Sequence, residues 1–374
     1  MTQPSPVRLR GMTWDHSRGI DGLRAADPVL IDRLGVTVDW EARSLLAFGD
    51  QHVADFAADY DLMVIDHPHV PDAVEARALL PLGDHPQLDL ESVGQSHTSY
   101  RYRGQQWGLG LDAAAQVSVL RADLAGGAPT YWSEVIELAR TRTVLWPWKP
   151  VDAFSTFATL LAQADAPLGA PDTFVDRSAA SEALEFMIRL AEAVPDWCKD
   201  ANPIDVAEAL STTDDYTVGV ALYGYTNYSR EGFRPHLLTY DDVPSRDGRA
   251  GGAVLGGAGV AVSATTTHPE LAVAAAVALA GADIQRGVYT TGGGQPGNLL
   301  AWKSDALGAL TNGFFRNTLR TLERAWVRPR LAGWPDFQLQ LSHLVRDAVI
   351  ARRVDASTLD AIERLPEMFS KEIR

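Results

Sequence analysis

The side chains best suited to binding or chemistry lie directly after three segments that are expected to be β-strands. They are Trp14, Asp15, His16, Arg43, Asp66, His67 and His69. An indole stacks on the apolar face of a sugar ring, and carboxylate and guanidinium groups hydrogen-bond hydroxyls. Because ligands of open α/β sheets bind at the carboxyl ends of the strands, these residues predict a site for a small polar molecule.

Each of these residues also has a structural interpretation. Trp14 could pack under the first helix while Asp15 caps that helix. Arg43 could pair with Glu41 on a solvated face. Asp66 could accept a hydrogen bond at the end of its strand, and the neighbouring histidines could shape a proline turn.

The His67-Pro-His69 sequence allows a further interpretation. In an extended chain, two residues separated by one point the same way, so the rings could hold a metal or act as a general base. His16, Asp66, His67 and His69 would then form an acid–base set for elimination, isomerisation or hydrolysis. The overall pattern favours neither a metal ion nor a cofactor, because no redox-cofactor motif is visible and Cys198 is the only cysteine.

A second group of candidates lies further along the chain. Trp146-Pro-Trp148-Lys149, together with Asp152, is the densest aromatic cluster of the sequence. It could form a stacking platform or a plug of the core, since tryptophan is usually well buried. Tyr225 and Asn227 follow a strand expected over residues 218–223 and offer a hydroxyl and an amide for hydrogen bonds.

The first 70 residues alternate between strand and helix patterns. Strands are expected over residues 7–13, 36–40 and 61–66, and helices over residues 20–34 and 44–60. This alternation is typical of βαβ units and predicts an α/β fold with a mostly parallel sheet. No Gly-x-Gly-x-x-Gly follows the first strand, which argues against a dinucleotide-binding fold.

The remainder is mixed and becomes helical at its end. We expect a strand over residues 106–120, a helix opening at Pro129 with Ser133 as its cap, helices over 178–193 and 207–211, a glycine-rich strand pair over 251–262, a helix over 271–282 and a mainly helical final 70 residues. No phosphate-binding loop or nucleophile elbow is present.

Composition limits the partners and the location. The chain has 374 residues, a length that favours two lobes. Its 33 basic and 48 acidic residues give it a net charge of −15 at pH 7. That charge argues against nucleic acid. The apolar run over 271–282 is too short to span a bilayer, so no membrane insertion is expected. The first residues lack a signal-peptide pattern, which predicts a cytoplasmic protein, or an extracytoplasmic one if a leader has been removed.

Three ordered stretches resemble a known family. They are Gly108-Leu-Gly-Leu-Asp112 with Val117-Ser-Val-Leu-Arg121 and Pro129-Thr-Tyr-Trp132; Gly256-Gly-Ala-Gly-Val-Ala-Val262 with Thr267-His-Pro-Glu-Leu-Ala272; and Gln285-Arg-Gly-Val-Tyr289 with Gly292-Gly-Gly-Gln-Pro296 and Arg328-Pro-Arg330. Their order and spacing are similar to those of family 1 extracellular solute-binding proteins, the sugar-type binding components of ABC transporters. The order is more specific for the fold than for the ligand.

The resemblance implies a two-lobe periplasmic-binding-protein-like fold of type II. Lobe 1 would hold residues 1–111 and 256–300, and lobe 2 would hold residues 112–255 and 301–374. A small polar solute such as a sugar, polyol or glycoside would bind in the cleft as the lobes close about a hinge. Asp112, at the hinge, would contact this ligand.

The partners implied by the resemblance are a small-molecule ligand and an ABC permease, with the protein itself a monomer. An enzyme on the same fold is the alternative function, because fold alone does not fix function. An anionic ligand also stays open, given four candidate cations: Arg18, Arg43, Arg234 and Lys149.

Overall fold

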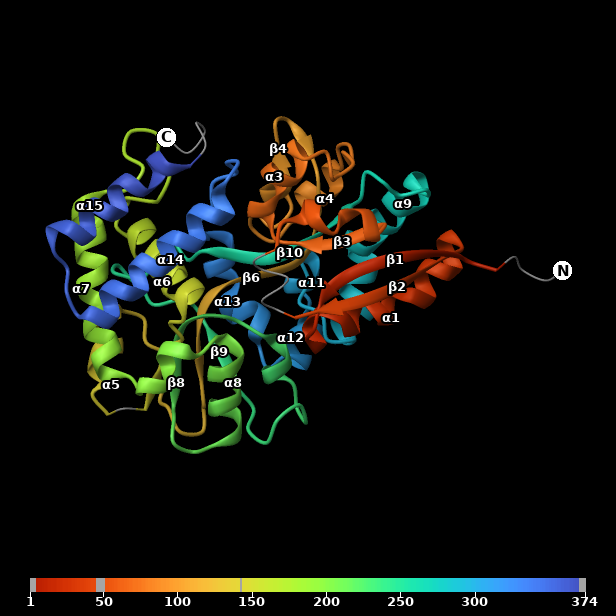
Figure 1. Cartoon of the computed structure of the whole chain (residues 1–374). Helices are drawn as coiled ribbons and strands as arrows, with labels where there is room; N and C mark the ends of the chain where they lie inside the picture. The colour runs from red at the N-terminus through yellow and green to blue at the C-terminus, as the bar shows by residue number, and fades with distance from the viewer. Residues whose placement is uncertain (1–4, 45–50, 142, 370–374) are drawn as a thin grey trace. The chain divides into compact units, whose positions relative to one another are not determined.

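The computed structural model describes residues 5–44, 51–141 and 143–369, and its chain forms two compact units (Figure 1). Unit 1 comprises Met1–Ala113 and Gly257–Leu307, and unit 2 comprises Ala114–Gly256 and Gly308–Arg374. The chain therefore passes from one unit to the other three times.

The sheet of unit 1 is built around β1 (Val7–Trp14). This strand pairs in parallel with β2 (Val36–Arg43) and with β3 (Leu62–Ile65). The next strand, β10 (Leu255–Val262), runs antiparallel to β3. The parallel arrangement predicted for the first three strands is confirmed, and it brings their carboxyl ends to one edge.

Helices cover this sheet. The helix α1 (Ser17–Leu34) ends at Gly35, whose left-handed backbone caps it. It packs against α9 (Pro269–Ala280), and both contribute to the buried apolar core of unit 1. The helix expected over residues 44–60 is not found: residues 45–50 lie outside the described part, and the remainder forms the 3-10 turns η1 (Val53–Asp55) and η2 (Ala57–Asp59).

Shorter elements complete unit 1. They are η3 (His67–His69), α3 (Val70–Glu75), α4 (Pro86–Leu90), η4 (Thr98–Tyr100), the hairpin strands β4 (Arg101–Tyr102) and β5 (Gln105–Gln106), α10 (Ala282–Ile284), the π-helical turn η7 (Gln285–Tyr289), α11 (Leu299–Trp302) and α12 (Asp305–Leu310), which ends in unit 2.

The strands of unit 2 surround β6 (Leu109–Leu120), which begins in unit 1 and is buried along its whole length. In unit 2 it pairs antiparallel with β8 (Val218–Tyr223) and with β9 (Thr239–Asp241). The short β7 (Val144–Leu145) runs parallel to β8. The predicted strand over 106–120 is thus one continuous strand from residue 109.

Helices make up the rest of unit 2. They are α5 (Trp132–Ala139), α6 (Pro150–Gln163), α7 (Arg177–Ala193), α8 (Pro203–Thr212), α13 (Phe314–Glu323), α14 (Trp334–Ala351) and α15 (Ala356–Arg364), with the short η5 (Asp196–Asp200), η6 (Thr226–Ser229) and η8 (Leu365–Met368). Helix α14 packs against both α6 and α7 (Figure 1). The mainly helical end of the chain was correctly predicted.

Two local predictions are wrong. Helix α5 begins at Trp132 with Tyr131, not Ser133, as its cap, because the Glu134 carboxylate accepts the Tyr131 backbone N–H at 3.0 Å. The glycine-rich segment forms the single strand β10 rather than a pair: only residues 255–262 are extended strand, and Val254 makes an isolated bridge with Trp326.

Within the described residues, no single helix has both the length and the hydropathy to cross a membrane. Pro269–Ala280 and Ala282–Tyr289 meet that criterion only as a pair, and the pair is bent by 50°.

Candidate functional site

The predicted residues of unit 1 come from one edge of its sheet. Because β1, β2 and β3 are parallel, the segments that follow them emerge on the same side. A hydrogen bond from the Asp15 backbone N–H to the Arg43 carbonyl, at 2.7 Å, joins the first two of these segments. The sequence was therefore sufficient to collect these residues at one edge.

Trp14 and His16 are used to build the start of α1. Trp14 is 4% exposed and packs against Gly19, where an added Cβ would lie 2.6 Å from the indole. His16 caps the helix, with Nδ1 accepting the Arg18 backbone N–H at 3.0 Å. Asp15 is exposed and is not the cap. The structural interpretation thus holds for Trp14, with His16 rather than Asp15 in the capping position.

The Asp66–His69 segment is a 3-10 turn, not the extended chain that a convergent His-x-His pair requires. Asp66 Oδ1 accepts the His67 backbone N–H at 2.8 Å and also lies 3.2 Å from His67 Nδ1. Pro68 fixes a backbone angle that suits the turn. Among the described residues, no group of three or more His, Cys, Asp or Glu side chains is arranged to hold a metal ion.

Asp112 is paired inside unit 1. Its Oδ2 accepts the Arg18 Nε–H at 2.8 Å and its Oδ1 contacts Arg18 Nη2, so the interaction is bidentate. Both side chains are at least nine-tenths buried. The charge of Arg18 is thus neutralised within the protein.

Arg43 contacts a different group. Its guanidinium lies over the Phe56 ring, 4.8 Å from the ring centroid.

The predicted residues of unit 2 also share one sheet edge. Strands β7 and β8 are parallel, so the Trp146–Lys149 segment and the Tyr225–Asn227 segment follow neighbouring strand ends. Tyr225 precedes η6 and Asn227 lies within it, and both are more than nine-tenths buried. Lys149 is the residue before α6.

The two tryptophans stack on each other but differ in their hydrogen bonds. Their ring centroids are 5.7 Å apart and their planes are inclined by 12°. Trp146 is fully buried, and its Nε1–H donates to Thr156 Oγ1 at 3.0 Å. Trp148 is 6% exposed, and its buried Nε1 has no hydrogen-bond partner among the described residues. Trp146 is therefore part of the core, whereas Trp148 retains an unused donor.

Sequence reasoning grouped Asp152 with the aromatic cluster but missed Ser155, Thr156 and Thr159. These four residues lie at i, i+3, i+4 and i+7 of α6 and so share one face of a helix that is buried from Asp152 to Leu161. Polar residues at helical spacing within an apolar run were the available signal. Cys198 lies in η5, and burial raises the pKa of its thiol to about 12, which keeps it protonated.

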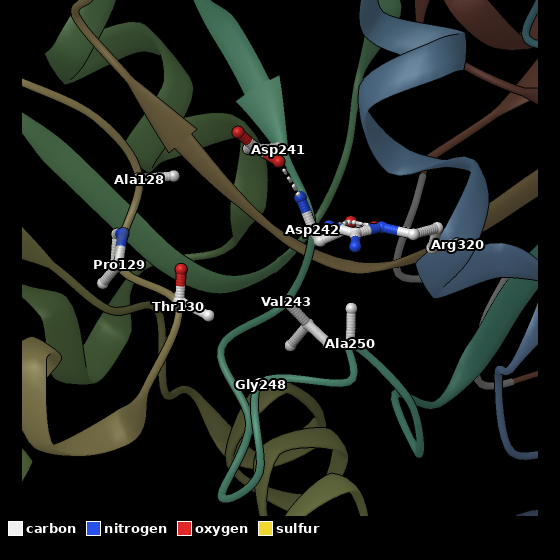
Figure 2. Close-up of a pocket in the computed structure, with 9 residues that line it drawn as sticks. All are labelled: Ala128, Pro129, Thr130, Asp241, Asp242, Val243, Gly248, Ala250 and Arg320. Atoms are coloured by element: carbon white, nitrogen blue, oxygen red, sulfur yellow. Dashed lines mark hydrogen bonds and ion pairs between the residues drawn. The ribbon is translucent and has the colours of Figure 1, made fainter.

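The described residues of unit 2 form surface hollows that include three lined by no predicted site residue. The smallest, of about 50 Å³, lies between β9 and the loop that holds Pro129 and Thr130 (Figure 2). Asp241 accepts the Asp242 backbone N–H at 2.8 Å, and Asp242 pairs with Arg320. This hollow has room for a few water molecules but not for a sugar.

The two larger hollows are surface grooves of about 510 and 520 Å³. In the first, between α5 and α7, the Arg189 guanidinium covers the Phe186 ring and Glu182 pairs with Arg246. Glu182 and Arg246 are therefore occupied with one another.

Comparison with known proteins places the chain among solute-binding proteins. Residues 50–307 match the sequence model of a family described as bacterial extracellular solute-binding protein. No curated protein matches the chain.

Solved structures share the fold at low identity. Maltose-bound MalE3 of T. maritima is 18% identical, with a TM-score of 0.82 over 97% of this chain and 100% of that one. An ABC transporter solute-binding protein of Agrobacterium radiobacter K84, in complex with ribitol, is 18% identical, with a TM-score of 0.81 over 98% and 100%. Another, from Thermotoga lettingae TMO with α-D-tagatose, is 15% identical, with a TM-score of 0.78 over 96% and 98%.

Proposed function

The chain belongs to the bacterial extracellular solute-binding protein family, and from this premise we propose that it binds an uncharged sugar or polyol as the solute-binding component of an ABC transporter. Structural relatives of the same fold include proteins in complex with maltose, ribitol and tagatose. In this role the protein acts outside the cytoplasm and delivers its solute to a permease.

The unit 2 edge that follows β7 and β8 carries the proposal. There, Trp148 combines an indole stacked on a second tryptophan with a buried Nε1–H that has no partner among the described residues. A buried donor without a partner is unfavourable, and a ligand oxygen satisfies it. A rigid aromatic side chain with a polar tip suits a sugar or polyol, which presents C–H groups and hydroxyls together.

The pairing of two of the four candidate cations, Arg18 and Arg234, favours an uncharged ligand over an anion. Arg18 is engaged with Asp112, and Arg234 Nε donates to both carboxylate oxygens of Glu208, at 2.8 and 2.9 Å. Neither guanidinium is available without breaking an existing ion pair. The net charge of −15 further disfavours acidic solutes.

The test is a binding screen on the purified protein. Maltose, ribitol, D-tagatose and related neutral compounds are compared with small organic acids by thermal shift and by tryptophan fluorescence. We expect at least one neutral compound to raise Tm and to change the fluorescence, and NMR to find that compound unchanged after hours. Stabilisation by acids alone would contradict the proposal, and consumption of the compound would indicate an enzyme.

The role of Trp148 is tested with a matched pair of variants. Trp148→Ala removes both the stacking surface and the donor, so affinity for the neutral hit should fall by at least about tenfold. Trp197→Ala is the control, because Trp197 is 36% exposed and is bonded to Tyr216 through its Nε1. Equal affinities for Trp148→Ala and the wild type would remove this residue from the site.

A further inference from the structure

The polar row of α6 is satisfied along its length except at Asp152. Thr156 Oγ1 accepts a hydrogen bond from the Trp146 indole N–H, and Thr159 Oγ1 donates one to Gln116 Oε1 at 2.6 Å. Ser155 Oγ lies 3.3 Å from the Tyr223 hydroxyl. Asp152 Oδ2 is buried and has no hydrogen-bond partner among the described residues. The row therefore begins with an acceptor that no described residue of this unit satisfies.

The surroundings of Asp152 combine burial with few compensating charges. The residue is 3% exposed and lies in the first turn of α6, where the helix dipole favours a carboxylate. Burial is the main cause that raises the pKa of Asp152 to about 7. Lys149, before α6, opposes this shift, and Asp205 of α8 adds to it. An unpartnered carboxylate is retained here at a cost to folding, which favours a role in binding.

A second buried polar atom without a hydrogen-bond partner among the described residues belongs to Trp148, four positions before Asp152 in the sequence. Trp148 Nε1 is a buried donor, and Asp152 Oδ2 is a buried acceptor. Hydroxyl groups both donate and accept hydrogen bonds, so a hydroxylated ligand has the chemistry that either atom requires.

We infer that Asp152 is a ligand-contacting residue that selects hydroxyl groups, with its Oδ2 accepting from a ligand hydroxyl while Trp148 Nε1–H donates to a ligand oxygen. This inference rests on the proposed function and names the hydroxyl-selective part of that site. A deoxy analogue leaves Asp152 without its donor and is rejected, because the acceptor then remains buried and unpaired.

The inference gives binding a defined pH dependence. A ligand hydroxyl donates to the ionised carboxylate, so binding favours that form and lowers the pKa of Asp152. Below pH 7 the free protein carries a proton on Asp152 that must leave on binding. Affinity is therefore greatest above pH 7 and falls as the pH decreases, by about tenfold at pH 6 relative to pH 8.

The experiment is isothermal titration calorimetry of the wild type and Asp152→Asn at pH 6 and pH 8. The probes are maltose, ribitol and D-tagatose, used with buffers of different ionisation enthalpy to count protons. We expect the wild type to lose about tenfold in affinity at pH 6 and to release protons there. Asp152→Asn should bind at least tenfold more weakly at pH 8, with no pH dependence.

Asp241→Asn is the matched control. Burial also raises the pKa of Asp241, but its carboxylate already accepts the Asp242 backbone N–H. This variant should keep both the affinity and the pH profile of the wild type.

The outcomes separate the two proposals. If a probe binds the wild type with equal affinity at both pH values and without proton release, the inference on Asp152 is wrong while the proposed function stands. This pH comparison needs only the wild-type protein, so it tests the inference even if Asp152→Asn does not fold. If no sugar or polyol binds at either pH, the proposed function itself is wrong and the inference falls with it.

Discussion

At the scale of single residues, the clearest finding is the partner of Asp112. The family resemblance implied that this carboxylate contacts the ligand, and in unit 1 it forms a buried bidentate pair with Arg18. Its position just before the chain leaves unit 1 gives the pair a structural task. It ties the start of α1 to β6 at the crossing point.

We expect removal of one member of this pair to be strongly destabilising. Arg18→Ala leaves the Asp112 charge buried without a partner, which should lower the free energy of unfolding by about 3–5 kcal/mol. Urea denaturation followed by circular dichroism measures this loss. Arg8→Ala is the control, because its pair with Asp39 is 71% and 62% exposed and contributes about 0–1 kcal/mol. Similar losses in the free energy of unfolding for both variants would show that the buried Arg18–Asp112 pair contributes no more to stability than the exposed Arg8–Asp39 pair.

At the scale of elements, β10 depends on a glycine close to β6. Gly257 has φ of +99°, and an added Cβ would lie 2.3 Å from the Asp112 carbonyl oxygen. A residue other than glycine is therefore disfavoured at this position for two reasons: its side chain would clash, and its backbone would rarely adopt this φ. The glycine-rich segment was wrongly assigned to two strands, because only residues 255–262 form a strand, β10.

Gly257→Ala should consequently destabilise the protein more than a substitution that meets only backbone strain. Gly83 provides that comparison, with φ of +75° and no atom within 4 Å of an added Cβ. We expect Gly83→Ala to lower the free energy of unfolding by about 1–2 kcal/mol. Gly257→Ala should lower it by at least about 1 kcal/mol more, since backbone atoms must also move. Equal values in urea titrations would rule out the steric contribution.

At the scale of the whole molecule, unit 1 is assembled from two distant segments. Its buried core combines Leu9 and Leu23 of the first segment with Val260, Ala272 and Leu279 of the second. Residues 1–113 alone would expose the surface that β10 and α9 cover. Independent folding therefore requires both segments.

A chain that joins residues 1–113 directly to residues 257–307 should fold as unit 1. The ends to be joined are adjacent, because a Cβ on Gly257 would lie 2.8 Å from the Ala113 Cα. We expect cooperative thermal unfolding and dispersed NMR signals for the joined chain, and neither for residues 1–113 alone. Cooperative folding of residues 1–113 by themselves would show that the second segment is dispensable.

The sequence by itself determined several regular elements and the edge of the unit 1 sheet at which candidate residues gather. Strands β1, β2 and β3 follow from short apolar runs, and α1 follows from its 3.6-residue spacing and its terminal glycine. These features depend on neighbours in the chain. The parallel order of the strands then fixes which loops share an edge. In unit 2 the strand β8 was predicted over residues 218–223, whereas the two-residue β7 was not predicted.

Only the tertiary structure decided what each candidate side chain contacts. Asp112 meets Arg18 across 94 residues, and the row on α6 meets Gln116 and Tyr223 on two different strands. Such partners depend on the packing of elements against one another, which local periodicity does not encode. Whether a polar group is satisfied within the protein, as in Asp112, or left for a ligand, as we infer for Asp152, therefore becomes visible only when the fold is complete.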